Sequence, residues 1–365
     1  MNVSLLSIRS LFRRFRSLSG RSFLSFLLVG LLASLALASC GGIGSKPEVK
    51  LNLVSFSVTK AAHDQIIPKF VEKWRKEHNQ KVIFQRSYGG SLAQADDVNA
   101  KRSLREIAGK QEADVVHLAL PLDVMRISQA GLINRGWEDR VPRRGVVSHS
   151  VAAIVTRAGN PKKIQSWADL AREDVTVLSA DPKTSGIAIW QLLALWGSVT
   201  QTGGEPQQAW DFVRRIYQKI PTLDRDAREA SNAFFQEGKG DVLVTYENEV
   251  ILAARNQPDT SYLVPPVNIS IDNPVAVVDR NVDKHGTREV AEAFVNFLYS
   301  EPAQQELAKL GYRSVNPFVA KDEGLQFPPI ETLFNAQDLG GWTLIQTEFL
   351  ADKGIFEQIK NQSAS

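Results

Sequence analysis

Asp181-Pro182-Lys183-Thr184-Ser185-Gly186-Ile187-Ala188-Ile189-Trp190 is the stretch of the sequence that decides the fold. Residues 175–179 before it have the β-branched composition of a strand, and residues 190–199 after it are apolar and long enough for a helix. The proline, hydroxyl residues and glycine in between predict a turn from a strand end into a helix start. Backbone N–H groups are left unpaired there, at the positive end of the helix dipole, which suits an anion. Helix capping by Ser185 is the plainer interpretation of one such stretch taken alone.

Three further junctions of the same kind occur in the chain. A predicted strand over 81–85 runs into Ser87-Tyr88-Gly89-Gly90-Ser91 and a helix, and residues 222–228 lead into a predicted helix over 229–237. A predicted strand over 241–245 ends at Tyr246-Glu247-Asn248-Glu249 before another helix. Alternating strands and helices predict parallel sheets, in which ligands bind beyond the carboxyl ends of the strands. The sequence therefore predicts an α/β protein with four junctions that point toward one ligand site.

The remaining elements complete an alternating pattern. Residues 113–120 form a continuous apolar run, typical of a strand buried on both faces. The other expected elements are strands over 49–57 and 148–156, a β-rich segment over 264–278, helices over 64–78, 123–132, 164–170, 207–218, 288–299 and 302–310, a helix or turn over 330–339, and a terminal helix over 342–359.

The first 40 residues have the pattern of a secretory signal. Residues 1–21 contain five arginines and no acidic residue, and residues 23–39 are apolar or small. A single membrane span is the alternative, but the stretch is short and rich in small residues at its end. Cys40 is the only cysteine of the chain, so it cannot form an intramolecular disulfide. Leu37-Ala38-Ser39-Cys40 resembles the lipobox of bacterial lipoproteins, which predicts a signal peptide over 1–39, lipidation of Cys40 and a tether over 40–47.

Charge and composition argue against several classes of function. Removal of the five signal arginines takes the formal net charge from +3 to −2, and no basic patch with interleaved aromatics occurs, so no nucleic-acid partner is expected. The five histidines lack paired metal-ligand spacing, and neither a Gly-x-Ser-x-Gly elbow nor a phosphate-binding glycine loop is present. We therefore expect no catalytic residue, no metal and no cofactor, and about 320 residues beyond the signal predict two lobes.

An ordered set of motifs resembles the periplasmic sulfate- and thiosulfate-binding proteins, the solute receptors of ABC importers. The motifs fall in family order over essentially the whole mature chain, and they are LVS at 53–55, FQRSYGGS at 84–91, ADVVHLAL at 113–120, DPKTSG at 181–186, GDVLVTYENE at 240–249 and GGW at 340–342. The resemblance implies a two-lobed periplasmic binding protein fold of type II, in which each lobe is a mostly parallel sheet flanked by helices and the ligand cleft lies between the lobes. The expected lobes are 48–149 with 271–335, and 150–270 with 336–365.

The resemblance also implies the ligand residues, because the family holds sulfate with neutral donors. Carried over position by position, the implied residues are Ser57, which matches an aspartate that orients the first loop; Ser91; Ser185; the backbone N–H groups of Gly186 and Ile187; the backbone of Ala227; and Tyr246, at the family's tryptophan position. The implied partners are ABC permease and ATPase subunits. The implied protein is a periplasmic monomer that meets the membrane only through its lipid.

The chain departs from the family pattern at several site positions. Ile187 and Ile189 replace a glycine and an arginine, Tyr246 replaces the tryptophan, and Leu92-Ala93-Gln94 replaces Gly-Lys-Gln after Ser91. Thiosulfate, molybdate and selenate therefore stay open as ligands beside sulfate, as does a sensory role on the same fold. A secreted hydrolase is the alternative from another class of protein.

Overall fold

The computed structural model describes residues 46–99, 112–256, 259–322 and 327–363. Glu48–Ser365 is one compact unit, which contains all the features described below except the first two residues of strand β1. The expected signal peptide and Cys40 lie outside the described residues. The expected tether over 40–47 is wrong at its end, because β1 already begins at Lys46. Among the described helices, none is long and apolar enough to cross a membrane.

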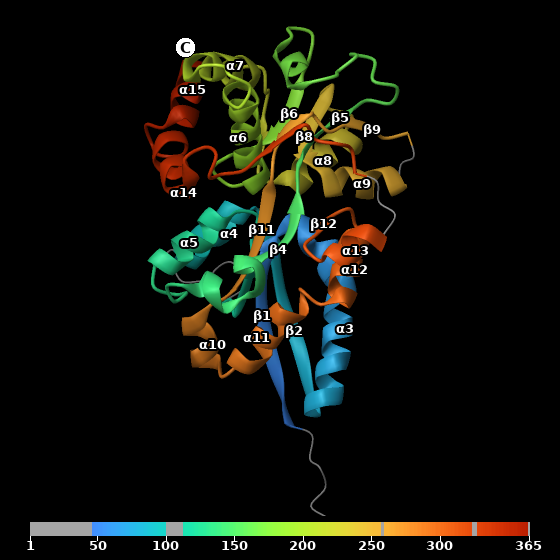
Figure 1. Cartoon of the computed structure of the whole chain (residues 1–365), viewed down its shortest axis with the longest axis vertical. Coiled ribbons are helices and arrows are strands. Elements are labelled where there is room, and N and C mark those ends of the chain that lie inside the picture. The colour runs from blue at the N-terminus through green and yellow to red at the C-terminus, as the bar shows by residue number, and fades with distance from the viewer. Residues whose placement is uncertain (1–45, 100–111, 257–258, 323–326, 364–365) are drawn as a thin grey trace, which may run out of the picture. The chain divides into compact units, whose positions relative to one another are not determined.

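A six-stranded sheet has the strand order β12-β4-β11-β3-β1-β2 (Figure 1). Strands β1 and β3 are parallel, with Leu53 opposite Val115, whereas β11 is antiparallel to both β3 and β4. The strands are β1 (Lys46–Phe56), β2 (Gln80–Gly89), β3 (Val115–His117), β4 (Val146–Ser150), β11 (Ile271–Val277) and β12 (Arg313–Ser314).

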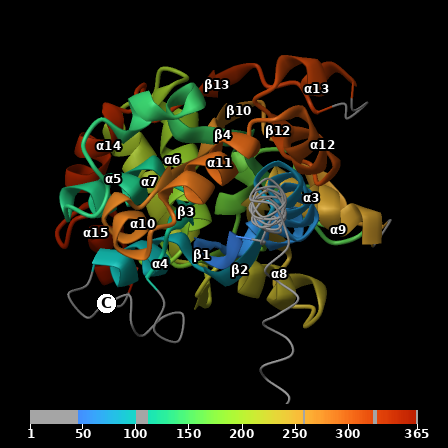
Figure 2. The same cartoon turned by 90° about the horizontal axis from the view of Figure 1, so that it is seen from below.

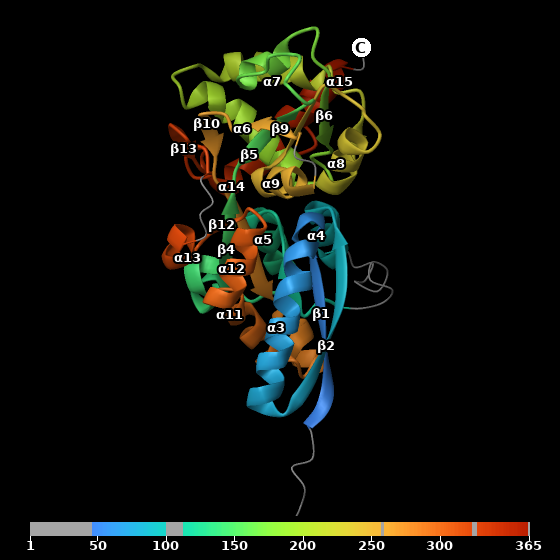
Figure 3. The ribbon, with the colours of Figure 1, turned by 90° about the vertical axis from the view of Figure 1, so that its right-hand side faces the viewer.

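Helices cover both faces of this sheet, and Figures 2 and 3 show α3 running alongside β1 and β2. One apolar cluster joins the sheet to α3, α11 and α12 around Phe70 and Phe294, and a second cluster joins its other face to α4 and α5 around Val124. The helical elements of this half are η2 (Ser57–Thr59), α3 (Lys60–His78), α4 (Ser91–Asn99), α5 (Pro121–Gln129), η3 (Trp137–Arg140), η4 (Pro142–Gly145), α10 (Asp279–His285), α11 (Arg288–Phe297), α12 (Glu301–Lys309) and α13 (Pro317–Asp322).

A five-stranded sheet has the order β7-β6-β8-β5-β9. Strand β6 is parallel to β7 and β8, and β5 is antiparallel to β8 and β9. Helices α6, α7 and α15 pack on one face and α8 with α9 on the other. The strands are β5 (Ala152–Thr156), β6 (Val177–Ala180), β7 (Leu223–Asp224), β8 (Val242–Tyr246) and β9 (Ser261–Leu263). The helical elements are η5 (Trp167–Ala171), α6 (Gly186–Thr200), α7 (Pro206–Tyr217), α8 (Ala227–Phe235), α9 (Glu247–Asn256), α14 (Gly341–Leu344), the π-helical turn Ile345–Phe349 and α15 (Ile355–Ser363).

The α/β class and the sheets flanked by helices are confirmed, with parallel pairs at β1–β3, β6–β7 and β6–β8. Both sheets are mixed, because β11 returns to the six-stranded sheet antiparallel to its neighbours and β5 does the same in the five-stranded one. The expected helix or turn over 330–339 contains β13 (Thr332–Phe334), which pairs with β10 (Val267–Ile269). The expected terminal helix breaks before α15, where a side chain at Gly354 would collide with the backbone of Phe349. The boundaries of the two lobes stay a prediction.

Candidate functional site

Helix starts that belong to different sheets meet at one place in the structure. Strands β6, β7 and β8 are followed by α6, α8 and α9, and β2 is followed by α4. Gly90, just before α4, approaches two of the other junctions so closely that an added β-carbon would lie 2.3 Å from the carbonyl oxygen of Thr184 and 3.2 Å from that of Arg225. The hydroxyl of Thr184 in turn donates a 2.7 Å hydrogen bond to the carbonyl of Arg225. Three of the four predicted junctions are therefore in mutual contact.

Gly186 lies at the centre of this arrangement. An added β-carbon there would lie 2.5 Å from the β-carbon of Ala119, 3.4 Å from the hydroxyl of Tyr246 and 3.5 Å from the β-carbon of Ser91. Ser91, Gly186 and Tyr246 are all buried. The structure thus brings together expected site residues that come from both sheets.

Ser185 occupies the N-cap position of α6 without capping the helix. Its backbone is extended (φ −120°, ψ 128°), its N–H donates to the carbonyl of Asp181 at 2.8 Å, and its side chain makes no capping hydrogen bond. The first N–H groups of a helix have no acceptor within the helix, which applies here to Gly186 and Ile187. The plain capping role is therefore not what the Ser185 hydroxyl performs, and it remains available beside two backbone donors.

Helix α8 starts differently, because the side chain of an aspartate accepts hydrogen bonds from two N–H groups of its first turn. The carboxylate of Asp226 accepts from the N–H groups of Arg228 at 2.8 Å and Glu229 at 3.1 Å. The N–H of Ala227 is the first-turn donor that this carboxylate does not take. That the backbone of Ala227 contributes to the ligand site stays a prediction.

The hydroxyl of Ser91 is already engaged within the protein. It donates to the Asp123 carboxylate at 2.5 Å and accepts from the N–H of Ala119 at 2.9 Å. A serine hydroxyl has one proton, so this side chain has no second donor to offer. What remains at the start of α4 is the backbone N–H of Ser91. Asp123, which our sequence analysis did not single out, fixes that geometry from a position 32 residues away.

Ser57 is half-buried at the start of η2, in a loop that contacts α8. Two neighbouring hydroxyl residues hold this loop: Ser55 donates to the carbonyl of His117 and Thr59 donates to that of Phe56, both at 2.7 Å. The sequence motif at 53–55 contains Ser55 without indicating its role, and Thr59 was missed. Their spacing at i and i+4 around a strand end is the only local signal for such a loop.

Tyr246 carries its proton under all physiological conditions. Burial is the largest cause that raises the pKa of its phenol well above the ordinary value, and the nearby Tyr312 and Asp123 raise it further. Its ring lies 6.0 Å from that of Phe56, which directly precedes Ser57. The phenol is therefore a neutral hydrogen-bond donor beside Gly186.

Two direct hydrogen bonds join the six-stranded half to the five-stranded half next to these residues. The indole N–H of Trp190 in α6 donates to the carbonyl of Ala119 at 2.8 Å, and the N–H of Ala93 in α4 donates to the carbonyl of Thr184 at 3.4 Å. Both bonds require the two halves to be closed on each other. The structure is thus a closed form.

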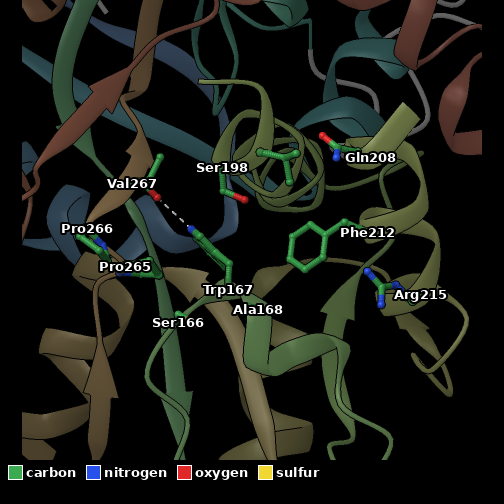
Figure 4. Close-up of a pocket in the computed structure, with 11 residues that line it drawn as sticks. Ser166, Trp167, Ala168, Ser198, Gln208, Phe212, Arg215, Pro265, Pro266 and Val267 are labelled. Atoms are coloured by element: carbon green, nitrogen blue, oxygen red, sulfur yellow. Dashed lines mark hydrogen bonds between the residues drawn. The ribbon is translucent and has the colours of Figure 1, made fainter. Parts of the chain in front are cut away.

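A pocket of about 480 Å³ lies away from this place, between α6, α7, η5 and the segment before β10 (Figure 4). Figure 4 shows Trp167 donating from its indole N–H to the carbonyl of Val267, at 2.9 Å, with the ring of Phe212 nearby. The lining of this pocket is largely apolar and includes none of the expected ligand residues. Among the described residues, no group of histidine, cysteine and acidic side chains is suited to hold a metal ion.

A buried histidine pair beside the site predicts a loss of stability in acid. Nε2 of His63 lies 3.1 Å from Nδ1 of His117, and burial lowers the pKa of His117 to about 3 and that of His63 well below its ordinary value. The unfolded chain binds these protons near pH 6.5, whereas the folded chain does not. The free energy of unfolding should therefore fall below pH 6.5, by up to about 1.4 kcal/mol per pH unit for each histidine.

Glu249 raises the free energy of unfolding as the pH falls through part of this range, because burial raises the pKa of its carboxyl to about 7. The measurement is therefore a difference: urea unfolding between pH 7.5 and 5 for the unmodified chain and for His63→Gln/His117→Gln. The double variant should show a smaller loss of stability with acidification. An equal slope in both proteins would refute the role of the pair.

The chain matches the family model described as bacterial extracellular solute-binding protein over residues 51–313. It is 46% identical to a sulfate-binding protein of Synechococcus elongatus, an alignment that covers 94% of this chain and 97% of that protein. It is 33% identical to a thiosulfate-binding protein of Pseudomonas aeruginosa, over 90% of this chain and 96% of the relative. Among solved structures, the sulfate-binding protein SubI of Mycobacterium tuberculosis superposes with a TM-score of 0.73 at 32% identity, over 83% of this chain and all of that one.

Proposed function

Because this chain belongs to the bacterial extracellular solute-binding proteins, we propose that it is the receptor of an ABC importer that binds sulfate or thiosulfate between its two lobes and delivers it to a membrane permease. The observation that carries the proposal is the meeting of the starts of α4 and α6 with Tyr246 around Gly186. The protein binds its ligand and does not convert it.

The binding chemistry follows from the charge of the ligand. Sulfate is a dianion at physiological pH, and its burial is costly unless each oxygen finds donors. Backbone N–H groups at helix starts supply donors without a counter-charge, and each charge-assisted bond contributes about 1.5–3 kcal/mol. Ser185 would supply its hydroxyl, and Gly186, Ile187, Ala227 and Ser91 their N–H groups.

The second lobe would complete the site through a phenol in place of the family's indole. Tyr246 stays protonated, so its hydroxyl can donate to an oxyanion. Ser57 would line the first-lobe side of the site from the loop that contacts α8. Ile187 is compatible with this arrangement, because its side chain packs in the apolar cluster with Ala188 and leaves its N–H as the contribution.

The same donors would serve other tetrahedral oxyanions. Molybdate and selenate are therefore the second candidate ligands, and a sensory role on the same fold is the second candidate function. Ile189, where the family has an arginine, is fully buried in the apolar core and supplies no cation beneath the site. Protonated oxyanions such as hydrogen phosphate should bind poorly, because their O–H would find no free acceptor.

Calorimetry decides the ligand. The unit Glu48–Ser365 contains every proposed site residue, so the chain without residues 1–40 is suited to titration with sulfate, thiosulfate, molybdate, selenate and phosphate. One site per chain for sulfate or thiosulfate, and none for phosphate, is the expected result. No heat from sulfate or thiosulfate at millimolar concentration would remove the proposed function.

Substitution of one donor gives the first quantitative prediction. Ser185→Ala removes a single charge-assisted hydrogen bond, so the Kd for sulfate should rise about 10- to 100-fold. Ser198→Ala is the matched control, because Ser198 lies in the same helix and donates to the carbonyl of Leu195, away from the site. Equal Kd values for Ser185→Ala and the unmodified chain would show that the hydroxyl does not bind the ligand.

For localisation, we propose a lipid-anchored monomer in the periplasm. The expected cleavage before Cys40 would leave a diacylglyceryl cysteine at the new N-terminus, and the anchor would keep the receptor near its permease and ATPase. Mass spectrometry of the N-terminal peptide from membranes should show the lipid. Release of Cys40→Ser from the membrane, with unchanged sulfate affinity, is the expected companion result.

A further inference from the structure

A second cavity, of about 490 Å³, lies between the six-stranded half and the segment 337–343, which packs on the five-stranded half. Residues of η3 and η4 line one side, including Trp137, Arg143 and Arg144, and Trp342 with Gln337 lines the other. None of the expected oxyanion residues takes part. The cavity brings together two sequence features that the oxyanion site does not use, the basic pair 143–144 and the GGW motif at 340–342.

Arg143 and Arg144 both have left-handed backbones, with φ values of 52° and 54°. This conformation is unfavourable for any residue with a β-carbon, and two in succession are uncommon outside glycine-containing turns. Such strain concentrates at ligand-binding segments, where the surrounding structure maintains it. The two arginines are exposed and follow one another at the wall of one cavity.

Within the described part of the chain, neither guanidinium group takes part in an ion pair or a hydrogen bond. Glu138 and Asp272 line the same cavity, yet neither lies within the 4.0 Å of these arginines that an ion pair requires. Asp272 instead accepts from the Ser270 hydroxyl at 3.1 Å and lies 2.7 Å from Nδ1 of His149. The wall therefore presents both signs of charge at separate points, without mutual neutralisation.

The aromatic side chains add a third kind of contact. Trp137 and Trp342 are almost completely buried, and Trp342 packs edge-on against Trp190 of α6 with ring centroids 5.2 Å apart. Their exposed edges give the cavity an apolar part between the charged groups. A cavity of this volume is in the size range of small-molecule sites.

We propose that this cavity is a second ligand site, and that it takes a small zwitterion with an anionic oxygen group and an ammonium group, such as an amino acid. The two guanidinium groups suit the carboxylate, since arginine matches planar oxyanions, and Glu138 with Asp272 suits the ammonium. The indole edges contact the remainder of the molecule. The proposal does not depend on which oxyanion the first site binds.

The ligand would contact both halves of the protein in the closed form, which gives it an influence on the first site. A molecule that binds only when the halves are closed raises the affinity of any other ligand that also requires closure, and the effect is reciprocal. An amino acid in this cavity should therefore tighten oxyanion binding. The affinity of the first site for its oxyanion would then depend on the concentration of a nitrogen-containing metabolite that binds the second site.

The test uses glycine, L-glutamate, L-lysine and L-phenylalanine as probes, in calorimetric titrations of the chain without residues 1–40. At least one should bind, and its analogue without the amino group should bind at least tenfold more weakly. Arg143→Gln/Arg144→Gln should weaken binding by a similar factor, whereas Arg135→Gln, an exposed arginine outside the cavity, should leave it unchanged. Arg143→Gly/Arg144→Gly removes both guanidinium groups, so it should weaken binding. Because it also removes the backbone strain, it should not lower the stability toward urea.

Competition with sulfate tests whether the probe binds in this cavity or at the oxyanion site. Binding of the probe should persist in Ser185→Ala and in saturating sulfate. The proposal is overturned if none of the four probes binds, if the arginine variants bind as well as the unmodified chain, if the analogue without an amino group binds equally well, or if sulfate displaces the probe. Failure of sulfate to bind would remove the function proposed above and leave this result intact.

Discussion

Gly90→Ala should abolish measurable sulfate binding, with a loss of at least about 100-fold, and leave the fold intact. The new β-carbon would lie 2.3 Å from the carbonyl oxygen of Thr184 and 3.1 Å from its carbonyl carbon. These are backbone atoms of the opposite half, so no side-chain rotation relieves the contact. The halves can separate instead, which removes the clash but leaves the ligand donors of the two halves apart. A 100-fold loss corresponds to about 2.8 kcal/mol of binding free energy.

The control for this substitution is Gly131→Ala. Gly131 has a positive φ of 76° and no atom within 4 Å of an added β-carbon, so alanine there costs stability but does not affect closure. Calorimetry with sulfate and urea unfolding of both variants separate the two effects. Binding by Gly90→Ala with an unchanged Kd would show that ligand binding does not require the closed arrangement.

Arg313→Ala should destabilise the protein by about 3–5 kcal/mol. Arg313 holds Glu247 in a two-point contact, with nitrogen–oxygen distances of 2.7 and 3.0 Å, and the Glu247 side chain is fully buried. Burial raises the pKa of Glu247, and Arg313 opposes that effect. Without the arginine, the carboxylate must stay buried and uncompensated or take up a proton.

The pair also joins the two halves, since Arg313 lies in β12 and Glu247 begins α9. The double variant Arg313→Met/Glu247→Gln should recover most of the loss, because no buried charge remains. Arg225→Ala is the matched control: it breaks an exposed pair with Glu229 and should cost no more than about 1 kcal/mol. Urea unfolding at pH 7 measures all three variants. Similar losses for Arg313→Ala and Arg225→Ala would contradict this account.

The junctions were predictable because their signals are local. A β-branched run, a glycine with hydroxyl neighbours and an apolar run follow one another within about ten residues, and the structure begins α4 at Ser91 and α6 at Gly186, inside these junctions. The spacing of Asp226 and Glu229 also has the form of a helix start, and the structure uses Asp226 as the cap.

Features that depend on distant parts of the chain were missed. The direction of β11 depends on which strands it joins, and no periodicity within residues 271–277 encodes that choice. The same limit applies to Ser91, since its hydroxyl is taken by Asp123 across the turn that follows β3. The close approach of Gly90 to Thr184 is also a property of closure, which a local pattern cannot show.

The most direct test of the central claim is a crystal structure of the chain without residues 1–40, grown with sulfate. We predict one sulfate beside Gly186, within hydrogen-bond distance of the Ser185 hydroxyl, the N–H groups of Gly186 and Ile187 and the Tyr246 hydroxyl, with no lysine or arginine in contact. A sulfate held by cationic side chains elsewhere, with the place beside Gly186 occupied only by protein atoms, would contradict the account.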